Sequence, residues 1–99
     1  MAKRVFFVAK GGVVQGVGFR YFARQKAQEY GITGWCRNTA DNKVEGEAQG
    51  EEDALSKFLK DVGEGPRHAT VVQLTRETRE TVSGEIFGII YPGILSLRR

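Results

Sequence analysis

The sequence predicts an α+β fold in which two helices cover one face of an antiparallel β-sheet. Three observations lead to this prediction. The chain has 99 residues, of which 40% are apolar, enough for one small domain with a single core. Its apolar residues recur at the period of strands in some segments and at the period of helices in others. The two helical segments are separated by two strand-like segments, the order of a split βαβ arrangement.

The first part of the chain is predicted to form a strand, a loop and a helix. Residues 5–9 are a continuous apolar run, as expected of a central strand. Residues 19–30 place apolar side chains on one face at helical spacing. Gly31 is expected to end this helix because glycine tolerates a positive φ angle. Residues 34–38 are then expected to form a short strand.

A turn and a further strand follow. Residues 39–42 are typical of a turn, in which Asn42 is expected to adopt a left-handed conformation. Residues 43–50 alternate between small or apolar and polar side chains, which predicts a half-exposed strand. Gly46 interrupts this strand, which is therefore expected to be locally weak.

A second helix and two more strands complete the pattern. The helix begins at residues 51–53, whose three negative charges suit a helix N-terminus, and ends in the glycine-proline segment 63–66. Its apolar stripe consists of Leu55, Phe58, Leu59 and Val62. A fourth strand is predicted over residues 69–74, with a polar extension to residue 79. After a turn at residues 81–84, residues 85–91 are predicted to form the fifth strand.

The resulting order, βαββαββ, is that of a ferredoxin-like fold, with an antiparallel sheet and both helices on one face. We expect a single domain over residues 1–99, with residues 92–99 as a C-terminal tail. The apolar side chains of that tail, Ile94, Leu95 and Leu97, are expected to pack on the domain or on a neighbouring molecule.

Charge and cysteine content narrow the class of protein. The net charge of +3 is modest, and the basic residues are scattered, so we expect no nucleic-acid partner. No apolar run is long enough to span a membrane, and the apolar run after the basic N-terminus is too short for a signal peptide. A single cysteine cannot form an internal disulfide. We therefore expect a cytoplasmic protein that contacts no membrane, and a monomer by default.

The most informative segment is the glycine-spaced loop at residues 12–18, between the first strand and the first helix. Its glycines let backbone N–H groups turn inward, and the helix N-terminus adds free N–H groups and a partial positive charge. Arg20, in the first turn of that helix, offers a planar fork suited to phosphate oxygens. The loop lacks the Gly-Lys-Ser/Thr ending of a P-loop and the third glycine of a dinucleotide loop. It therefore predicts a site for one phosphoryl group, unless it is only a tight turn with Arg20 in solvent.

Ordinary catalytic groups are scarce in this sequence. His68, the single histidine, has no acidic residue at a pairing spacing and is expected to be a surface residue. Cys36 lies inside a short strand and is expected to be a small core residue. No group of residues has the spacing of metal ligands. An enzyme with this sequence would work by positioning and electrostatics, without a metal or a side-chain base.

Asn38, at the end of the strand 34–38, is the second candidate site residue. Asparagine is common at strand ends for reasons of turn formation alone. Its amide can both donate and accept hydrogen bonds, so it could also hold a water molecule beside the anion loop.

Together these motifs resemble those of the acylphosphatase family. The resemblance covers residues 4 to about 91. It rests on Gly12-x-Val14-Gln15-Gly16-Val17-Gly18-Phe19-Arg20, followed by Gly34-Trp35-x-x-Asn38, Val44-Glu45 and Gly65-Pro66. It implies an enzyme, an acylphosphate phosphohydrolase, that cleaves the carboxyl–phosphate bond of small acyl phosphates and releases a carboxylate and inorganic phosphate.

The resemblance also implies roles for particular residues. The phosphate would be held by Arg20 and by the loop N–H groups of Gln15, Gly16, Val17, Gly18, Phe19 and Arg20. Asn38 would position the attacking water. No cofactor and no metal are implied, since the phosphate of the substrate is thought to take the proton from the water. Asn42 stands where the family commonly has glycine, a mild departure because asparagine also tolerates a positive φ angle.

Besides a structural or regulatory ligand-binding domain without turnover, two other functions remain open from the sequence. One is a non-catalytic, anion-binding module of the same fold, such as the domain that heads larger carbamoyl transferases of hydrogenase maturation. Those chains continue into cysteine pairs, whereas this chain stops at Arg99 with one cysteine, which disfavours that function. The other is an RNA-binding ferredoxin-like domain, which displays aromatic side chains on its strands. Phe6 and Phe7 lie on the first strand, but the accompanying motif does not follow.

Overall fold

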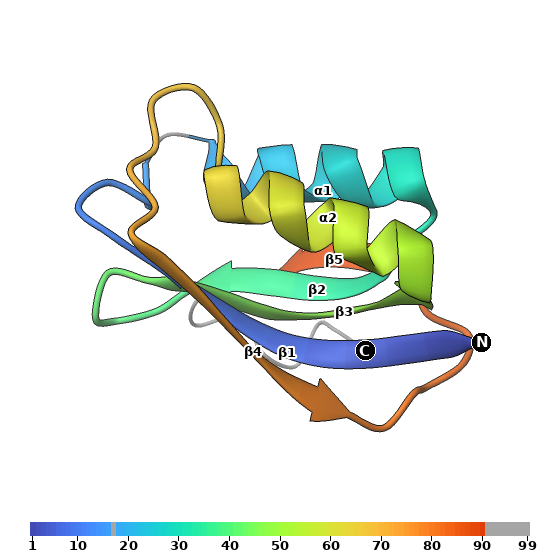
Figure 1. Cartoon of the computed structure of the whole chain (residues 1–99). Helices are drawn as coiled ribbons and strands as arrows, with labels where there is room; N and C mark the ends of the chain where they lie inside the picture. The colour runs from blue at the N-terminus through green and yellow to red at the C-terminus, as the bar shows by residue number, and fades with distance from the viewer. Residues whose placement is uncertain (17, 91–99) are drawn as a thin grey trace.

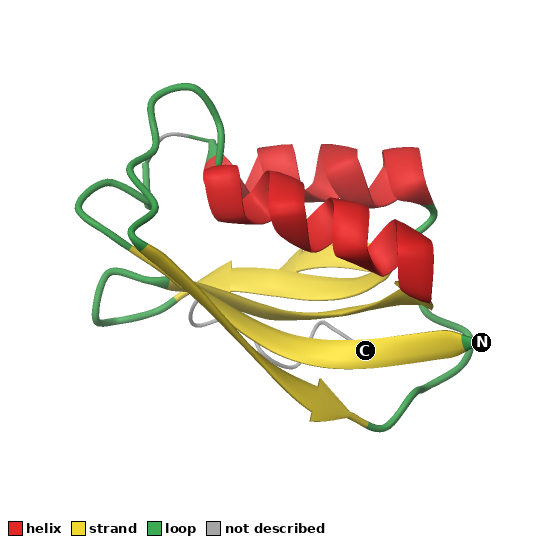
Figure 2. Cartoon of the chain, viewed as in Figure 1, coloured by secondary structure: helices red, strands yellow, loops and turns green. Residues whose placement is uncertain are grey.

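The computed structural model describes residues 1–16 and 18–90 of the chain (Figure 1). Its elements follow the predicted order: β1 (Ala2–Lys10), α1 (Phe19–Tyr30), β2 (Thr33–Asn38), β3 (Val44–Glu51), α2 (Glu52–Glu64), β4 (Gln73–Arg79) and β5 (Phe87–Ile90). Both helices lie on one face of the sheet, as Figure 2 shows. The α+β, ferredoxin-like prediction is therefore confirmed. The expected tail at residues 92–99 lies outside the described residues.

The sheet has the strand order β4-β1-β3-β2-β5. The β1–β3, β1–β4 and β2–β3 pairs are antiparallel, as predicted, but β5 pairs with β2 in parallel, so the sheet is mixed. The physical reason is the path of the chain. The segment 80–86 reverses direction after β4 and passes the N-terminal end of β1 on its way to the opposite edge (Figure 1). As a result β5 runs in the same direction as β1, and hence as β2.

The last two strands begin later than the sequence predicted. The backbone N–H of Thr70 donates to the carbonyl oxygen of Val13 at 2.6 Å, and that of Val72 donates to Lys10 at 2.9 Å. Thr70 therefore contacts the loop that follows β1 and Val72 contacts the end of β1, whereas regular pairing of β4 with β1 starts only at Gln73. Likewise, β5 starts at Phe87 instead of residue 85. The predicted end of β5, residue 91, lies outside the described residues.

The core lies between the sheet and the two helices. Phe58 of α2 contacts Phe7 of β1 and Phe87 of β5, with ring centroids 6.0 and 5.9 Å apart. The predicted apolar stripe of α2 is buried: Leu55, Phe58, Leu59 and Val62. Phe19, Ala23 and Ala27 of α1 are buried on the facing side. This packing fixes α1, and with it the loop that precedes the helix, over β2 and β5.

Gly46 does not interrupt the pairing of β3 with its neighbours. It pairs with Phe7 on one side and with Cys36 on the other in uninterrupted ladders. A Cβ atom on Gly46 would lie 2.1 Å from the Trp35 oxygen and 2.9 Å from Cζ of Phe7. Glycine is therefore required here, because the backbone oxygen of Trp35 and the Phe7 ring occupy the space of a side chain. The predicted positive φ angle of Asn42 is confirmed, at 65°.

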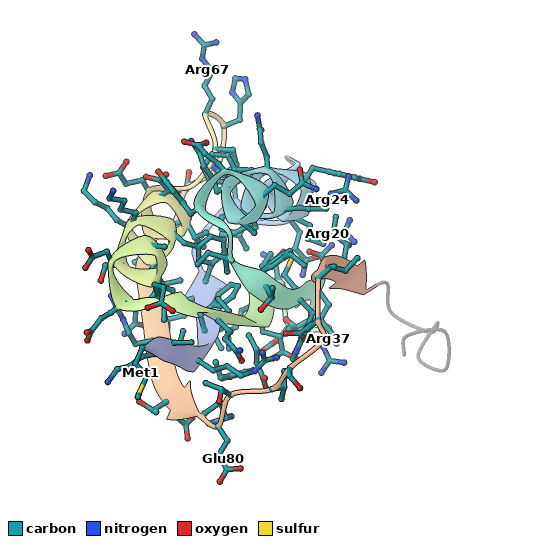
Figure 3. The ribbon with its side chains drawn as sticks, turned by 90° about the vertical axis from the view of Figure 1, so that its right-hand side faces the viewer. Met1, Arg20, Arg24, Arg37, Arg67 and Glu80 are labelled. Atoms are coloured by element: carbon teal, nitrogen blue, oxygen red, sulfur yellow. The ribbon has the colours of Figure 1, made fainter. Side chains whose placement is uncertain are left out.

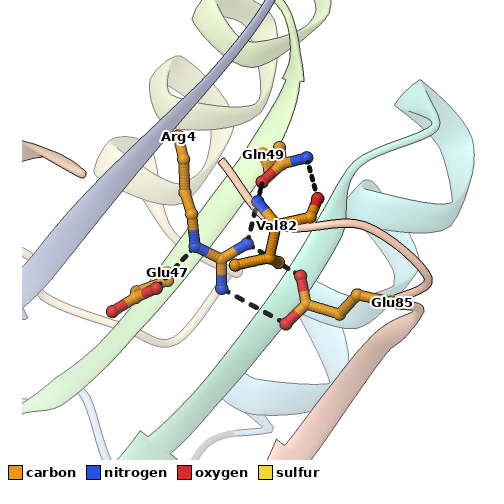
Figure 4. A network of polar contacts seen from close by, with 5 residues as sticks. All are labelled: Arg4, Glu47, Gln49, Val82 and Glu85. Atoms are coloured by element: carbon orange, nitrogen blue, oxygen red, sulfur yellow. Dashed lines mark hydrogen bonds and ion pairs between the residues drawn. The ribbon is translucent and has the colours of Figure 1, made fainter. Parts of the chain in front are cut away.

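Arg4 is buried on the face of the sheet opposite the helices, with only 3% of its surface exposed (Figure 4). Its guanidinium donates to Glu47 and Gln49 of β3 and, through two nitrogens, to Glu85. The side chain of Gln49 in turn bonds both the N–H and the carbonyl oxygen of Val82. This network attaches the segment 80–86 to the sheet and so guides the chain toward β5.

Replacing Arg4 by methionine is expected to lower the free energy of unfolding by about 2–3 kcal/mol. The change leaves Glu47 and Glu85 close together without a counter-charge, although partial exposure of both carboxylates moderates the cost. Urea unfolding of the variant against the parent measures the effect. Lys3→Met, which removes the same charge from an exposed position of the same strand, is the control and should change little. Equal effects of the two changes would contradict the role given to the Arg4 network.

Candidate anion site

The loop between β1 and α1 is held at its base by two contacts. Val14 is completely buried and anchors the middle of the loop. Val13 pairs with Thr70 in an antiparallel bridge, so the segment before β4 runs beside the loop. A Cβ atom on Gly11 would lie 1.8 Å from the Thr70 oxygen, so only glycine allows this close approach. The loop therefore starts from a fixed position at one end of the sheet.

Gly16 and Gly18 give the upper part of the loop its shape. Their φ angles are 77° and 75°, in the left-handed region that favours glycine. Gly18 is the N-cap of α1, and the backbone N–H of Phe22 donates to its oxygen at 2.9 Å. No side chain caps this helix, and its first turn holds no acidic residue. The N-terminus of α1 therefore keeps its partial positive charge, which favours a bound anion. Val17 lies outside the described residues.

Arg20 lies in the first turn of α1 and is half-buried. Its backbone oxygen is 3.9 Å from Sγ of Cys36, so this turn lies directly over β2. Figure 3 shows Arg20 and Arg24 on the side of the molecule where β5 lies. Both positive charges act on the Cys36 thiol. The predicted phosphate-binding arginine thus lies above the strand that ends in Asn38.

Asn38 is the last residue of β2. Side chains alternate along a strand, so Asn38 shares the helix-facing side with the buried residues Gly34 and Cys36. Its Oδ1 atom is buried and accepts no hydrogen bond from the described residues. An unpaired buried acceptor costs about 1–3 kcal/mol. A polar ligand such as water would satisfy it.

Gln15 connects the loop to the turn after Asn38. Its Nε2 donates to the backbone oxygens of Thr39 and Lys43, both at 2.9 Å. The loop and the C-terminal end of β2 are therefore neighbours. From the sequence, only a backbone role was expected for Gln15, and this side-chain contact was not predicted. Its two partners lie 24 and 28 residues further along the chain, so no local pattern indicates it.

Comparison with known proteins identifies the family. The acylphosphatase family model matches residues 5–89. The acylphosphatase of Geobacillus kaustophilus is 43% identical over 90 residues, which cover 90% of this chain and 95% of the relative. The acylphosphatase of Thermotoga maritima is 42% identical over 80 residues, which cover 81% of this chain and 89% of the relative. The crystal structure of acylphosphatase from Bacillus subtilis matches with a TM-score of 0.83 at 34% identity, over 92% of this chain and 100% of that one.

The chain belongs to the acylphosphatase family. The sequence-based prediction of an acylphosphatase enzyme is thereby confirmed. The loop 12–18 and the strand 34–38 both lie within the matched residues.

The other polar residues that the sequence singled out do not form a second site among the described residues. His68 is exposed in the loop after α2, as predicted. Among the described residues, no three His, Cys, Asp or Glu side chains come together as metal ligands. A pocket of about 160 Å³ lies at the other end of β1, between α2 and β4, and is lined by none of the candidate residues. No helix in the described part of the chain is long and apolar enough to cross a membrane.

Cys36 is completely buried beneath α1, as predicted for a core residue. Burial raises the pKa of its thiol to about 12, although Arg20 and Arg24 act in the opposite direction. We expect the folded protein to react with a disulfide reagent at mildly alkaline pH roughly 10³-fold more slowly than the urea-unfolded chain. Equal rates would show that Cys36 is accessible and that the first turn of α1 does not cover it.

Proposed function

We propose that the chain hydrolyses acyl phosphates at the site formed by the loop 12–18, Arg20 and Asn38. The observation that carries the proposal is the unpaired Oδ1 of Asn38, on the same face and at the same end of the sheet as the first turn of α1. Arg20 and the N–H groups of residues 15–20 bind the phosphoryl oxygens. Asn38 accepts a hydrogen bond from a water molecule, so that the water oxygen is directed at the phosphorus.

The reaction needs no nucleophilic side chain. The water oxygen forms a bond to phosphorus while the bond between phosphorus and the acyl oxygen breaks. The carboxylate leaves with the electron pair of that bond, and the proton of the water passes to a phosphoryl oxygen. Arg20 and the helix N-terminus stabilise the negative charge on the phosphoryl oxygens as the group is transferred. The fixed loop places the phosphorus, and Asn38 places the water, so catalysis comes from position and charge.

The face of the sheet opposite the helices does not favour the RNA-binding alternative. Its aromatic side chains, Phe6 and Trp35, are half-buried instead of displayed. Arginines cover both: Arg79 lies 4.9 Å from the centre of the Phe6 ring, and Arg37 lies 5.6 Å from that of Trp35. Glu45 pairs with Arg37 on the same face and adds negative charge. A platform for stacked bases requires open aromatic faces.

Hydrolysis of benzoyl phosphate tests the proposal directly. The pure protein should accelerate loss of the mixed anhydride in proportion to its concentration, while the heat-unfolded protein should not. Inorganic phosphate should compete with the substrate, because it fits the same single-phosphate site. No acceleration would refute the proposed function, and purely noncompetitive inhibition would place the anion site elsewhere.

Activity is expected to be independent of metal ions. The proposed step uses Arg20 and backbone N–H groups where many phosphoryl-transfer enzymes use Mg²⁺. Excess EDTA should therefore leave kcat and KM for benzoyl phosphate unchanged. A loss of activity that Mg²⁺ or Zn²⁺ restores would overturn this mechanism.

A further inference from the structure

The Gln15 side chain forms a bridge between two parts of the proposed site. Gln15 is the only residue of the loop 11–18 whose side chain can form hydrogen bonds, because the others are glycines and valines. Its amide nitrogen bonds two backbone oxygens, one from each side of the β2–β3 turn. Both N–H donors of the Gln15 amide are therefore used to bind this turn.

The turn that Gln15 contacts is cross-linked by its own hydrogen bonds. The backbone N–H of Thr39 donates to the Lys43 oxygen at 2.9 Å, and that of Lys43 donates to Oγ1 of Thr39 at 2.9 Å. Asp41 accepts from the Thr39 hydroxyl and pairs with the Lys43 ammonium. The hydrogen bonds from Lys43, first, and from Thr39 stabilise the ionised carboxylate and lower the pKa of Asp41 to about 2. Asn38 directly precedes this turn, so the position of the turn constrains that of Asn38.

At the loop end of the bridge, Gln15 lies between a buried residue and the open part of the loop. Gln15 follows Val14, which is completely buried, and precedes Gly16, where the open part of the loop begins. A change in the bridge would therefore alter the separation between the loop and Asn38 without disturbing the anchor in the core. Displacement of a reacting group by about 1 Å can cost on the order of 10²-fold in rate.

We infer that Gln15 is a positioning residue, whose side chain sets the separation between the phosphate-binding loop and the water held by Asn38. The inference rests on the proposed function. It assigns to the Gln15 side chain a role in addition to the proposed binding of phosphate by the Gln15 backbone N–H. Gln15 touches neither water nor phosphate through its amide in this role, and acts on the reaction only through the turn.

Gln15→Met tests the inference, because methionine keeps the length of the side chain and removes both donors. We expect kcat for benzoyl phosphate to fall roughly tenfold to a hundredfold, while KM and the inhibition constant of inorganic phosphate change less than about threefold. Gln28→Met, at an exposed position of α1, is the matched control and should leave kcat unchanged. A Gln15→Met variant with the kcat of the parent would refute the inference. The inference would also be refuted if kcat falls only in proportion to the fraction of folded protein, as thermal unfolding measures it.

A double-mutant cycle with Asn38→Ala distinguishes positioning from a general loosening of the site. If Gln15 acts through Asn38, Gln15→Met should cost little further kcat once the Asn38 amide is gone. Independent, multiplicative losses would overturn the inference, since Gln15 would then act on the loop alone. An inactive parent protein would refute the proposed function, and the inference with it. An active parent whose Gln15→Met variant keeps the same kcat would refute the inference alone, so the two failures are distinguishable.

Discussion

Arg20→Gln is expected to lower kcat/KM for acyl phosphate hydrolysis by about 10³-fold and to weaken the binding of inorganic phosphate. Glutamine keeps one donor group but loses the positive charge and the planar fork that binds two phosphoryl oxygens at once. Each charge-assisted hydrogen bond contributes about 1.5–3 kcal/mol. Because the phosphoryl group is bound in the ground state and in the transition state, both KM and kcat should change. Steady-state kinetics with benzoyl phosphate and calorimetric titration with phosphate measure the two effects.

Arg24→Gln is the matched control for this result. Arg24 lies one helical turn after Arg20, stacks on Tyr21 and also acts electrostatically on Cys36. Arg24→Gln removes the same charge from the same region, so this variant measures the long-range electrostatic part of the loss in kcat/KM. We expect that part to be within about threefold. If the two variants lose activity equally, general positive charge explains the effect, and Arg20 has no specific contact with the phosphate.

Asn38→Ala is expected to reduce kcat by about 10²–10³-fold while phosphate affinity stays within a few-fold of the parent. This is the range for loss of one preorganised polar group. Inorganic phosphate does not need the attacking water, so its binding should not depend on the Asn38 amide. The measurements are turnover with benzoyl phosphate and phosphate affinity by competition. A loss of phosphate binding as complete as that in Arg20→Gln would make Asn38 a phosphate ligand, and full activity would mean that another group places the water.

The same substitution should not destabilise the protein. Oδ1 of Asn38 accepts no hydrogen bond from the described residues, so its removal breaks no hydrogen bond of the fold at this atom. We expect the free energy of unfolding of Asn38→Ala to equal or exceed that of the parent, by up to about 1 kcal/mol. A lower activity together with an equal or higher stability would mark Asn38 as a residue retained for function.

Local sequence patterns were enough to predict the helices and the two principal candidates. The predicted range of α1, residues 19–30, agrees with the structure, because helical spacing begins after Gly18 and ends at Gly31. The glycine spacing and Arg20 indicated an anion site, and Asn38 was placed correctly at the end of β2. These features depend on residues within a few positions of one another, and such short-range effects can be read from the sequence directly.

Tertiary structure decided the features that depend on distant residues. The parallel pairing of β5, the backbone pairing of residues 70–72 with residues 10–13 and the burial of Arg4 each require partners far apart in the chain. Gly46 looked like a weak point of its strand, and only the close approach of the Trp35 backbone oxygen and the Phe7 ring shows why glycine is needed. The Gln15 bridge also depends on distant residues, since its amide donates to two backbone oxygens of the β2–β3 turn. A sequence specifies such contacts only through the whole fold, because hydrogen-bond partners of this kind leave no periodic pattern in either segment.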